Sequence, residues 1–190
     1  LVGIINGLWA NSLGNGGIIH IQTKYMPSNN LLELKLTGQQ GDVMQESMNV
    51  AKTLALNLLS EQEKDILFKN LENNKFKGIH IHCPEGAMKK DGPSAGIAIT
   101  MALYSLFTNK RIKNNIALTG EINLQGNVTE IGGLDCKIIG GIKAGVKHFI
   151  YPKTNSKDFN DFKEKYKTKK LENIKFNEVS NVYNVIDLIF

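Results

Sequence analysis

Apolar residues recur along the chain with two spacings, and each spacing predicts one kind of element. Apolar positions that alternate with polar ones predict strands, and a spacing of three to four residues predicts helices. Two strands are predicted at the start of the chain, on either side of a turn at 11–17. Further strands, one of them part of a hairpin, are predicted at 31–38, 78–84, 115–128, 146–152 and 173–180.

Helices are predicted at 43–59, 93–108, 134–144 and 181–190, with a short helical patch at 66–71 and a loop or exposed helix at 153–170. Asp42 is in place to cap the first helix, with Gln45 three residues on, and Gly145 to end the third. The helix at 93–108 is apolar on nearly every side and is therefore predicted to be buried. Strands that alternate with helices indicate a single mixed α/β or α+β domain over 1–190, with helices packed on a sheet.

Composition places the chain among ordinary globular domains. It has 190 residues, of which 42% are hydrophobic and 22% are charged. These values exclude a disordered tail, a collagen-like fibre and a membrane protein. Cys83 and Cys136 are too few for a disulfide framework and fit a reducing compartment. The first ten residues carry no charge, unlike a signal or transit peptide. Because the chain begins with Leu1, we expect it to be a piece of a longer polypeptide.

The net charge of +5 is concentrated in one stretch. Residues 153–175 contain eight lysines and four acidic residues, interleaved as on a solvated helix face. The chain has 22 lysines but a single arginine, Arg111. Arginine is the residue that reads base edges and binds phosphates through paired hydrogen bonds. The charge therefore predicts a solvated surface, and docking to an acidic partner or to nucleic acid is the less favoured alternative.

The segment PEGAMKKDGPSAG, at 84–96, places a serine where an anion would be stabilised. A charged loop ends at Gly92, and Pro93 is predicted to open a buried helix, because its missing N–H costs nothing in a first turn. Ser94 would then lie in that first turn, among unpaired N–H groups at the positive end of the helix dipole. The alternative is that Ser94 is only a helix cap.

A serine hydroxyl needs a neighbouring base to act as a nucleophile, and a lysine can serve if burial lowers its pKa. The segment IGGLDCKIIGGIKAG, at 131–145, offers Lys137 at the edge of an apolar helical stripe. A lysine among glycine, isoleucine and leucine is a candidate for desolvation. The alternative is that Lys137 extends its ammonium to water, as lysines at such edges usually do. Spacing alone leaves a Ser94–Lys137 pair as one hypothesis.

The sequences DGPSAG, at 91–96, and TGEINLQGNVTEIGGLDCK, at 119–137, resemble the proteolytic domain of Lon, the ATP-dependent protease, in its A-type form. The resemblance extends over essentially all 190 residues. It implies the Lon proteolytic-domain fold, of the ribosomal-protein-domain-2-like type. It also implies a serine endopeptidase in which Ser94 is the nucleophile and Lys137 is the general base and acid, without a catalytic histidine.

The resemblance implies roles for further residues of the same motifs. Thr119 matches a threonine whose hydroxyl holds the lysine amine. Asp91 matches the acidic residue before Gly92 and Pro93. The resemblance implies that Asp91 caps the helix, or that it pairs with Lys137 in an inactive arrangement.

His80 and His82 alternate on one predicted strand, so both are expected to point to the same face. The family has the same pair, and we interpret them as support for the active-site loop. They could also begin a metal site, but no third ligand has a suitable spacing, so no metal is expected. Cys83 would face away from His82, which disfavours a Cys–His pair, and Cys136 is interpreted as a packing residue.

The resemblance also implies what lies outside this sequence. The chain has no GxxxxGK[ST] phosphate loop. No cofactor is therefore expected here, and ATP and Mg²⁺ would bind an ATPase domain that precedes Leu1. Family members form hexameric rings that act on unfolded or damaged polypeptides. The compartment implied is the mitochondrial matrix, with the bacterial cytoplasm as the alternative, and no membrane partner is expected.

Two other functions stay open at this point. The chain could be a non-catalytic relative that uses the same fold as an assembly or binding module. It could also be a small-molecule kinase, in which the Gly-rich loop and the helix N-terminus would hold phosphate. The lack of a second phosphate-binding loop disfavours the kinase.

Overall fold

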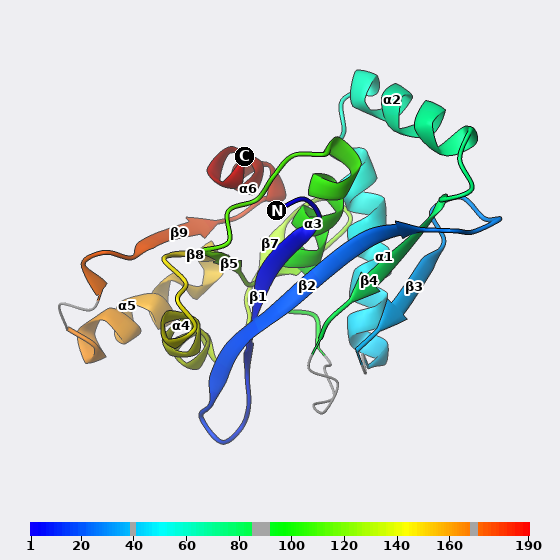
Figure 1. Ribbon diagram of the computed structural model, residues 1–190. Coiled ribbons are helices and arrows are strands. Elements are labelled where there is room, and N and C mark those ends of the chain that lie inside the picture. The colour runs from blue at the N-terminus through cyan, green and yellow to red at the C-terminus, as the bar shows by residue number, and fades with distance from the viewer. Residues whose placement is uncertain (39–40, 85–91, 168–170) are drawn as a thin grey trace.

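The computed structural model describes residues 1–38, 41–84, 92–167 and 171–190 (Figure 1). Its centre is a seven-stranded sheet in which β2 runs antiparallel to both of its neighbours, while all other neighbouring strands are parallel. In spatial order the strands are β3 (Leu34–Thr37), β4 (Gly78–His82), β2 (Gly16–Met26), β1 (Ile4–Ala10), β5 (Ile116–Leu118), β8 (His148–Pro152) and β9 (Lys175–Val179). Two short strands, β6 (Glu121–Ile122) and β7 (Val128–Thr129), form a separate hairpin.

Helices cover both faces of the sheet. They are α1 (Asp42–Asn57), α2 (Glu61–Glu72), α3 (Gly96–Thr108), α4 (Leu134–Lys143), α5 (Ser156–Lys165) and α6 (Val182–Ile189), with a 3₁₀ turn, η1 (Lys153–Asn155). One buried cluster joins a face of the sheet to α1, α2, α3 and α6, and a second joins the opposite face to α4 and α5. Ala117 and Leu118 of β5 fall into different clusters, because successive side chains of a strand point to opposite faces. The predicted mixed α/β class is confirmed.

α2 is a complete helix where the sequence suggested only a short patch at 66–71. The Ser60 hydroxyl accepts a hydrogen bond from the Glu63 N–H (3.1 Å), and the Glu63 carboxylate accepts one from the Ser60 N–H (2.9 Å). Only Leu67 and Leu71 of this helix are buried. The reciprocal cap therefore stabilises a helix whose apolar face is narrow. None of the helices in the described ranges is long and apolar enough to cross a lipid bilayer.

Two predicted details of other elements are wrong. Gly41, and not Asp42, is the N-cap of α1, and Asp42 is its first residue. The segment 115–128 is not one hairpin, because β5 joins the main sheet between β1 and β8. All three residues of β5 are buried, which requires a strand on each side and a helix layer on each face.

Candidate active site

Ser94 lies in a tight turn that leads into α3. The helix begins at Gly96 with Ala95 as its N-cap, so the prediction that it starts at Pro93, with Ser94 in its first turn, is wrong. The Pro93 carbonyl instead accepts a hydrogen bond from the Gly96 N–H (3.1 Å). Gly92 has a φ of +116°, a conformation that favours glycine. The turn leaves Ser94 partly exposed at the protein surface.

Hydrogen bonds tie this turn to the segment that joins β5 to β6. The Gly120 N–H donates to the Ser94 carbonyl (2.8 Å), and the Ile97 N–H donates to the Gly120 carbonyl (3.1 Å). A Cβ on Gly96 would lie 2.7 Å from the Ile122 side chain. The space beside Gly96 is therefore filled by the protein's own strand β6.

Thr119 is buried beside the Ser94 turn, with an exposed fraction of 1%. Its hydroxyl donates a long hydrogen bond to the Ser94 carbonyl (3.5 Å). Among the described residues no hydrogen bond joins Thr119 to Lys137, which is the contact implied by the family resemblance. Thr119 is therefore found in contact with the backbone of the expected nucleophile.

Lys137 lies in the second turn of α4, and only 4% of it is exposed. Burial lowers its pKa from 10.5 to about 8, because the charged form loses its hydration. Within the part of the chain that the structure describes, the amine has no hydrogen-bond or ion-pair partner. The expected desolvation is confirmed, and the alternative that Lys137 reaches water is wrong.

α4 is seated on the sheet by contacts of backbone against backbone. A Cβ on Gly140 would lie 2.1 Å from the Gly16 carbonyl carbon, and a Cβ on Gly16 would lie 2.1 Å from the Cys136 carbonyl oxygen. Gly145, with a φ of +91°, ends the helix as predicted, and its N–H donates to the Ile142 carbonyl (3.0 Å). These contacts fix how close the helix that carries Lys137 comes to β2.

The side of the sheet that α4 covers is also the side of Thr119. Ala117 of β5 belongs to the cluster around α4. Thr119 lies two residues further on and continues the strand pairing, since its N–H donates to the Ile150 carbonyl (3.1 Å). By strand alternation its side chain points to the α4 side. Ser94 is thus tied to the end of β5, and no hydrogen bond joins Ser94 to Lys137 among the described contacts.

His80 and His82 point to the same face of β4, as predicted. The Thr37 hydroxyl of β3 is hydrogen-bonded to both rings, at 2.8 Å from His80 Nε2 and 2.7 Å from His82 Nδ1. Burial lowers the pKa of His80, and the nearby charge of Lys35 adds to the effect. Thr37 was not singled out from the sequence, because only the pairing of β3 with β4 brings it to the histidines.

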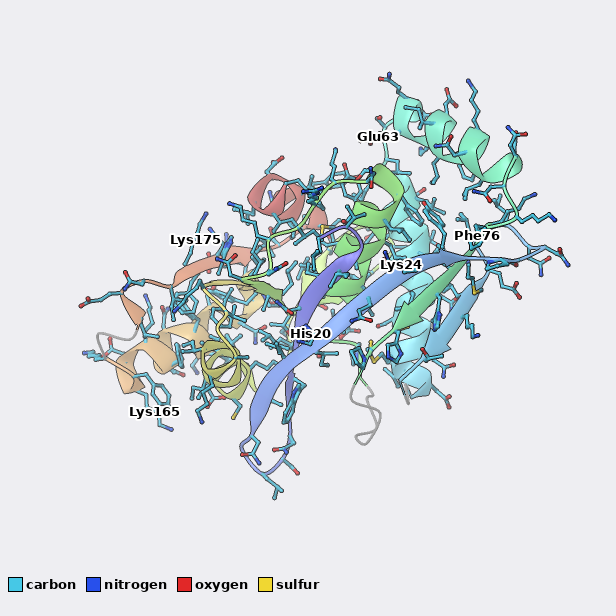
Figure 2. All side chains as sticks on the ribbon, viewed as in Figure 1. His20, Lys24, Glu63, Phe76, Lys165 and Lys175 are labelled. Carbon is cyan, nitrogen blue, oxygen red and sulfur yellow. The ribbon has the colours of Figure 1, made fainter. Side chains whose placement is uncertain are left out.

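This histidine face continues onto the neighbouring strand. Lys24 of β2 lies opposite His80 in the strand register, and Figure 2 shows Lys24 and His20 on β2. The loop that the histidines were expected to support, and Asp91 within it, lie outside the described residues. In the described ranges no three His, Cys, Asp or Glu side chains are grouped so that they could hold a metal ion.

A buried amide behind α4 was also missed from the sequence. Asn155 is 1% exposed. Its Oδ1 accepts from the Ile131 N–H (3.0 Å), and its Nδ2 donates to the Ile131 carbonyl (2.8 Å). Asn155 and Ile131 are 24 positions apart, so no local sequence pattern reports the contact.

Comparison with known proteins adds evidence that is independent of this geometry. Residues 1–190 match the family described as Lon protease (S16) C-terminal proteolytic domain. The chain is 42% identical over 189 residues to the Lon protease of Borrelia duttonii (strain Ly), which covers 99% of this chain and 22% of that protein. It is 37% identical over 188 residues to the Lon protease of Fervidobacterium nodosum, covering 99% of this chain and 22% of that protein.

A mitochondrial relative gives a similar match. The chain is 41% identical over 169 residues to the mitochondrial Lon protease homolog of Drosophila melanogaster, which covers 84% of this chain and 16% of that protein. The chain spans about a fifth of the length of the curated relatives it matches.

Proposed function

Since the chain belongs to the Lon protease (S16) C-terminal proteolytic domain family, we propose that it hydrolyses peptide bonds with Ser94 as nucleophile and Lys137 as general base and acid. The observation that carries this proposal is the burial of Lys137, which lowers the pKa of its amine to about 8. A lysine with that pKa is neutral in about a tenth of the molecules at pH 7. A neutral amine is what a base needs in order to accept a proton.

The proposed reaction proceeds through an acyl-enzyme. Neutral Lys137 takes the proton from Ser94 Oγ, and the oxygen attacks the carbonyl carbon of the peptide. Lys137, now charged, gives that proton to the leaving amine, and water then releases the acyl group from Ser94. The leaving amine departs as the free N-terminus of the second product.

Backbone donors of the Ser94 turn are proposed to hold the oxyanion. In the described part of the chain, neither the Ser94 N–H nor the Ala95 N–H donates to a protein acceptor. The next two N–H groups, those of Gly96 and Ile97, are already bonded to Pro93 and Gly120. The two unbonded donors at the nucleophile are therefore the candidates, and a donor of this kind is worth about 3 kcal/mol in the transition state.

The surrounding residues are proposed to support this chemistry. Thr119 would orient the Ser94 turn through the hydrogen bond from its hydroxyl to the Ser94 carbonyl. On the family resemblance it would also hold the amine of Lys137. His80 and His82 would support the active-site loop, with Thr37 fixing their rings. The family resemblance also assigns Asp91 to this group, as a helix cap or as a partner of Lys137 in an inactive arrangement.

For the whole polypeptide we propose an ATP-dependent protease that acts on unfolded or damaged proteins. The relatives are about five times as long as this chain, which leaves room for an ATPase domain that binds ATP and Mg²⁺. The proposed assembly is the hexamer of the family. The proposed compartment is the mitochondrial matrix, with the bacterial cytoplasm as the alternative. Cys83 and Cys136 form no disulfide in the described part of the chain, which fits either reducing compartment, and fractionation of cells that produce the intact polypeptide decides between them.

A pH–rate profile of peptide hydrolysis by the intact polypeptide tests the dyad. Ser94→Ala and Lys137→Arg are expected to lower kcat/KM about a thousandfold or more, because one lacks the nucleophile and arginine does not release its proton. In the unaltered protein kcat/KM should rise with pH through an apparent pKa near 8. Lys143→Arg, at the exposed end of the same helix, is the matched control and should keep this profile. Activity that survives Lys137→Arg would exclude Lys137 as the base, and an unaltered protein that cleaves no peptide would favour the non-catalytic module.

A further inference from the structure

The side chain of Asn155 makes two hydrogen bonds to the backbone of the segment that precedes α4. Asn155 stands at the end of η1 and is the N-cap of α5. Its side-chain amide bonds both the N–H and the carbonyl of Ile131, as a neighbouring strand would, at 3.0 and 2.8 Å. The same amide nitrogen donates to Asp158 Oδ2 (2.8 Å). The carboxylate therefore fixes which end of the amide faces which backbone group.

The segment 131–133 depends on this contact for its position. Ile131 is only half-buried, and Gly132 and Gly133 are exposed. A hollow of about 400 Å³ lies between the segment and α5, and the partly buried side chain of Ile131 packs against the cluster around α4 and α5. Among the described residues, the backbone N–H and carbonyl of Ile131 have no hydrogen-bond partner other than Asn155.

Segment 131–133 in turn sets the first turn of α4. Gly133 is the N-cap of the helix, in the left-handed conformation at φ +67°. Its carbonyl accepts the Lys137 N–H (3.0 Å), which is the first hydrogen bond of the helix. Only Gly132 lies between Ile131 and Gly133. A shift of Ile131 would therefore reach the backbone of Lys137 through the hydrogen bond at the Gly133 carbonyl. Only five residues lie between Ile131 and Lys137, too few to absorb a displacement in a helical turn.

We propose that Asn155 is a positioning residue for Lys137: by holding Ile131 at both backbone groups, it keeps the amine of Lys137 in its buried, dehydrated position. The inference rests on the proposed Ser94–Lys137 chemistry. It differs from a purely structural role, because a residue that only stabilises the fold would change the amount of folded protein and not the ionisation of the folded enzyme.

Asn155→Asp tests this with almost no change of shape. The new carboxylate can still accept from the Ile131 N–H, but it repels the Ile131 carbonyl and the carboxylate of Asp158. Water is then expected to reach Lys137 and raise its pKa. The rise of kcat/KM with pH, which is the acid limb of the profile, should then have an apparent pKa above about 8. Each unit by which this pKa increases should lower kcat/KM at pH 7 about tenfold.

Asn6→Asp is the matched control. Asn6 is another buried asparagine whose amide bonds two backbone carbonyls across the sheet, at 2.8 and 3.0 Å, and it does not contact 131–133. Its replacement should destabilise the protein by a similar route while the acid limb stays near 8. Rates are compared per folded molecule, with the folded fraction taken from thermal unfolding of each variant.

Asp158→Ala covers the case in which Asn155→Asp does not fold. Asp158 is exposed, and its removal leaves both Ile131 bonds but loses the partner that orients the amide. A smaller upward shift of the same limb is expected. An acid limb that stays near 8 in Asn155→Asp, or in Asp158→Ala if the first variant is unfolded, overturns the inference. Failure of the proposed function looks different, because Lys137→Arg would then remain active or the unaltered protein would show no limb near 8.

Discussion

Lys137 keeps its amine in the protein interior with a pKa of about 8, although its ordinary value is 10.5. Between these two pH values the unfolded chain binds more protons than the folded one, so stability should rise as the pH increases through this window. Below pH 8 both forms are charged, and the folded state carries the full penalty of roughly 3 kcal/mol. The residue that makes the proposed chemistry possible is therefore a burden on the fold.

Lys137→Met tests this burden. Methionine has a similar shape and no charge, so the free energy of unfolding at pH 7 should increase by up to about 3 kcal/mol. Its rise between pH 8 and 10.5 should disappear. Chemical denaturation at four pH values across this range measures both effects, with the exposed Lys143→Met as control. A rise with pH that persists in Lys137→Met would show that other groups cause it.

At the residue scale, the sequence predicted the burial of a single side chain better than it predicted contacts between residues far apart in the chain. The desolvation of Lys137 could be predicted because its apolar neighbours lie within one helix, where spacing determines which residues share a face. The turn at Ser94 could not, because it is fixed by a hydrogen bond to Gly120, 26 positions further along the chain. Asn155 and Thr37 escaped notice for the same reason, since each acts on a segment that only the fold brings near.

At the element scale, α4 is positioned by glycine. Gly140→Ala would place a methyl group 2.1 Å from the Gly16 carbonyl carbon, where backbone cannot move aside as a side chain would. The helix-propensity gain of about 1 kcal/mol from glycine to alanine should be outweighed, and we expect a net loss of about 1–3 kcal/mol of stability from overpacking. Thermal and urea unfolding measure the loss. Gly132→Ala is the control, because nothing lies within 4 Å of its added methyl; a stabilised Gly140→Ala would refute the close contact.

Element boundaries show where local patterns are sufficient. The end of α4 was predicted because Gly145 carries the signal itself. The length of α2 was underestimated, since its evidence is the pair Ser60 and Glu63 and not its sparse apolar residues. β5 was predicted as part of a hairpin over 115–128. Its true partners, β1 and β8, are more than 20 residues away in the chain, and periodicity cannot specify such pairings.

At the scale of the whole molecule, the candidate site joins two layers that pack on opposite faces of one sheet. The Ser94 turn leads into α3, which packs in the cluster with α1. Lys137 belongs to α4, which packs with α5 in the other cluster. The end of β5 is common to both, since Gly120 bonds the Ser94 turn and Ala117 belongs to the cluster that contains α4. The class of fold followed from the alternation of strands and helices, but the strand order that unites the two layers did not.

This arrangement also bears on the kinase alternative. A phosphate bound at the N-terminus of α3 would need several free N–H groups. Those of Gly96 and Ile97 already donate to Pro93 and Gly120, which leaves only those of Ser94 and Ala95 among the described residues. Titration of ATP with Mg²⁺ into the 190-residue domain should therefore give no heat of binding.

In the intact polypeptide the same titration should show binding, and ATP should accelerate the degradation of an unfolded protein, because the proposed nucleotide site lies outside this domain. Measurable ATP binding by the domain alone would revive the kinase, and degradation by the intact polypeptide at the same rate without ATP would contradict its proposed dependence on the nucleotide.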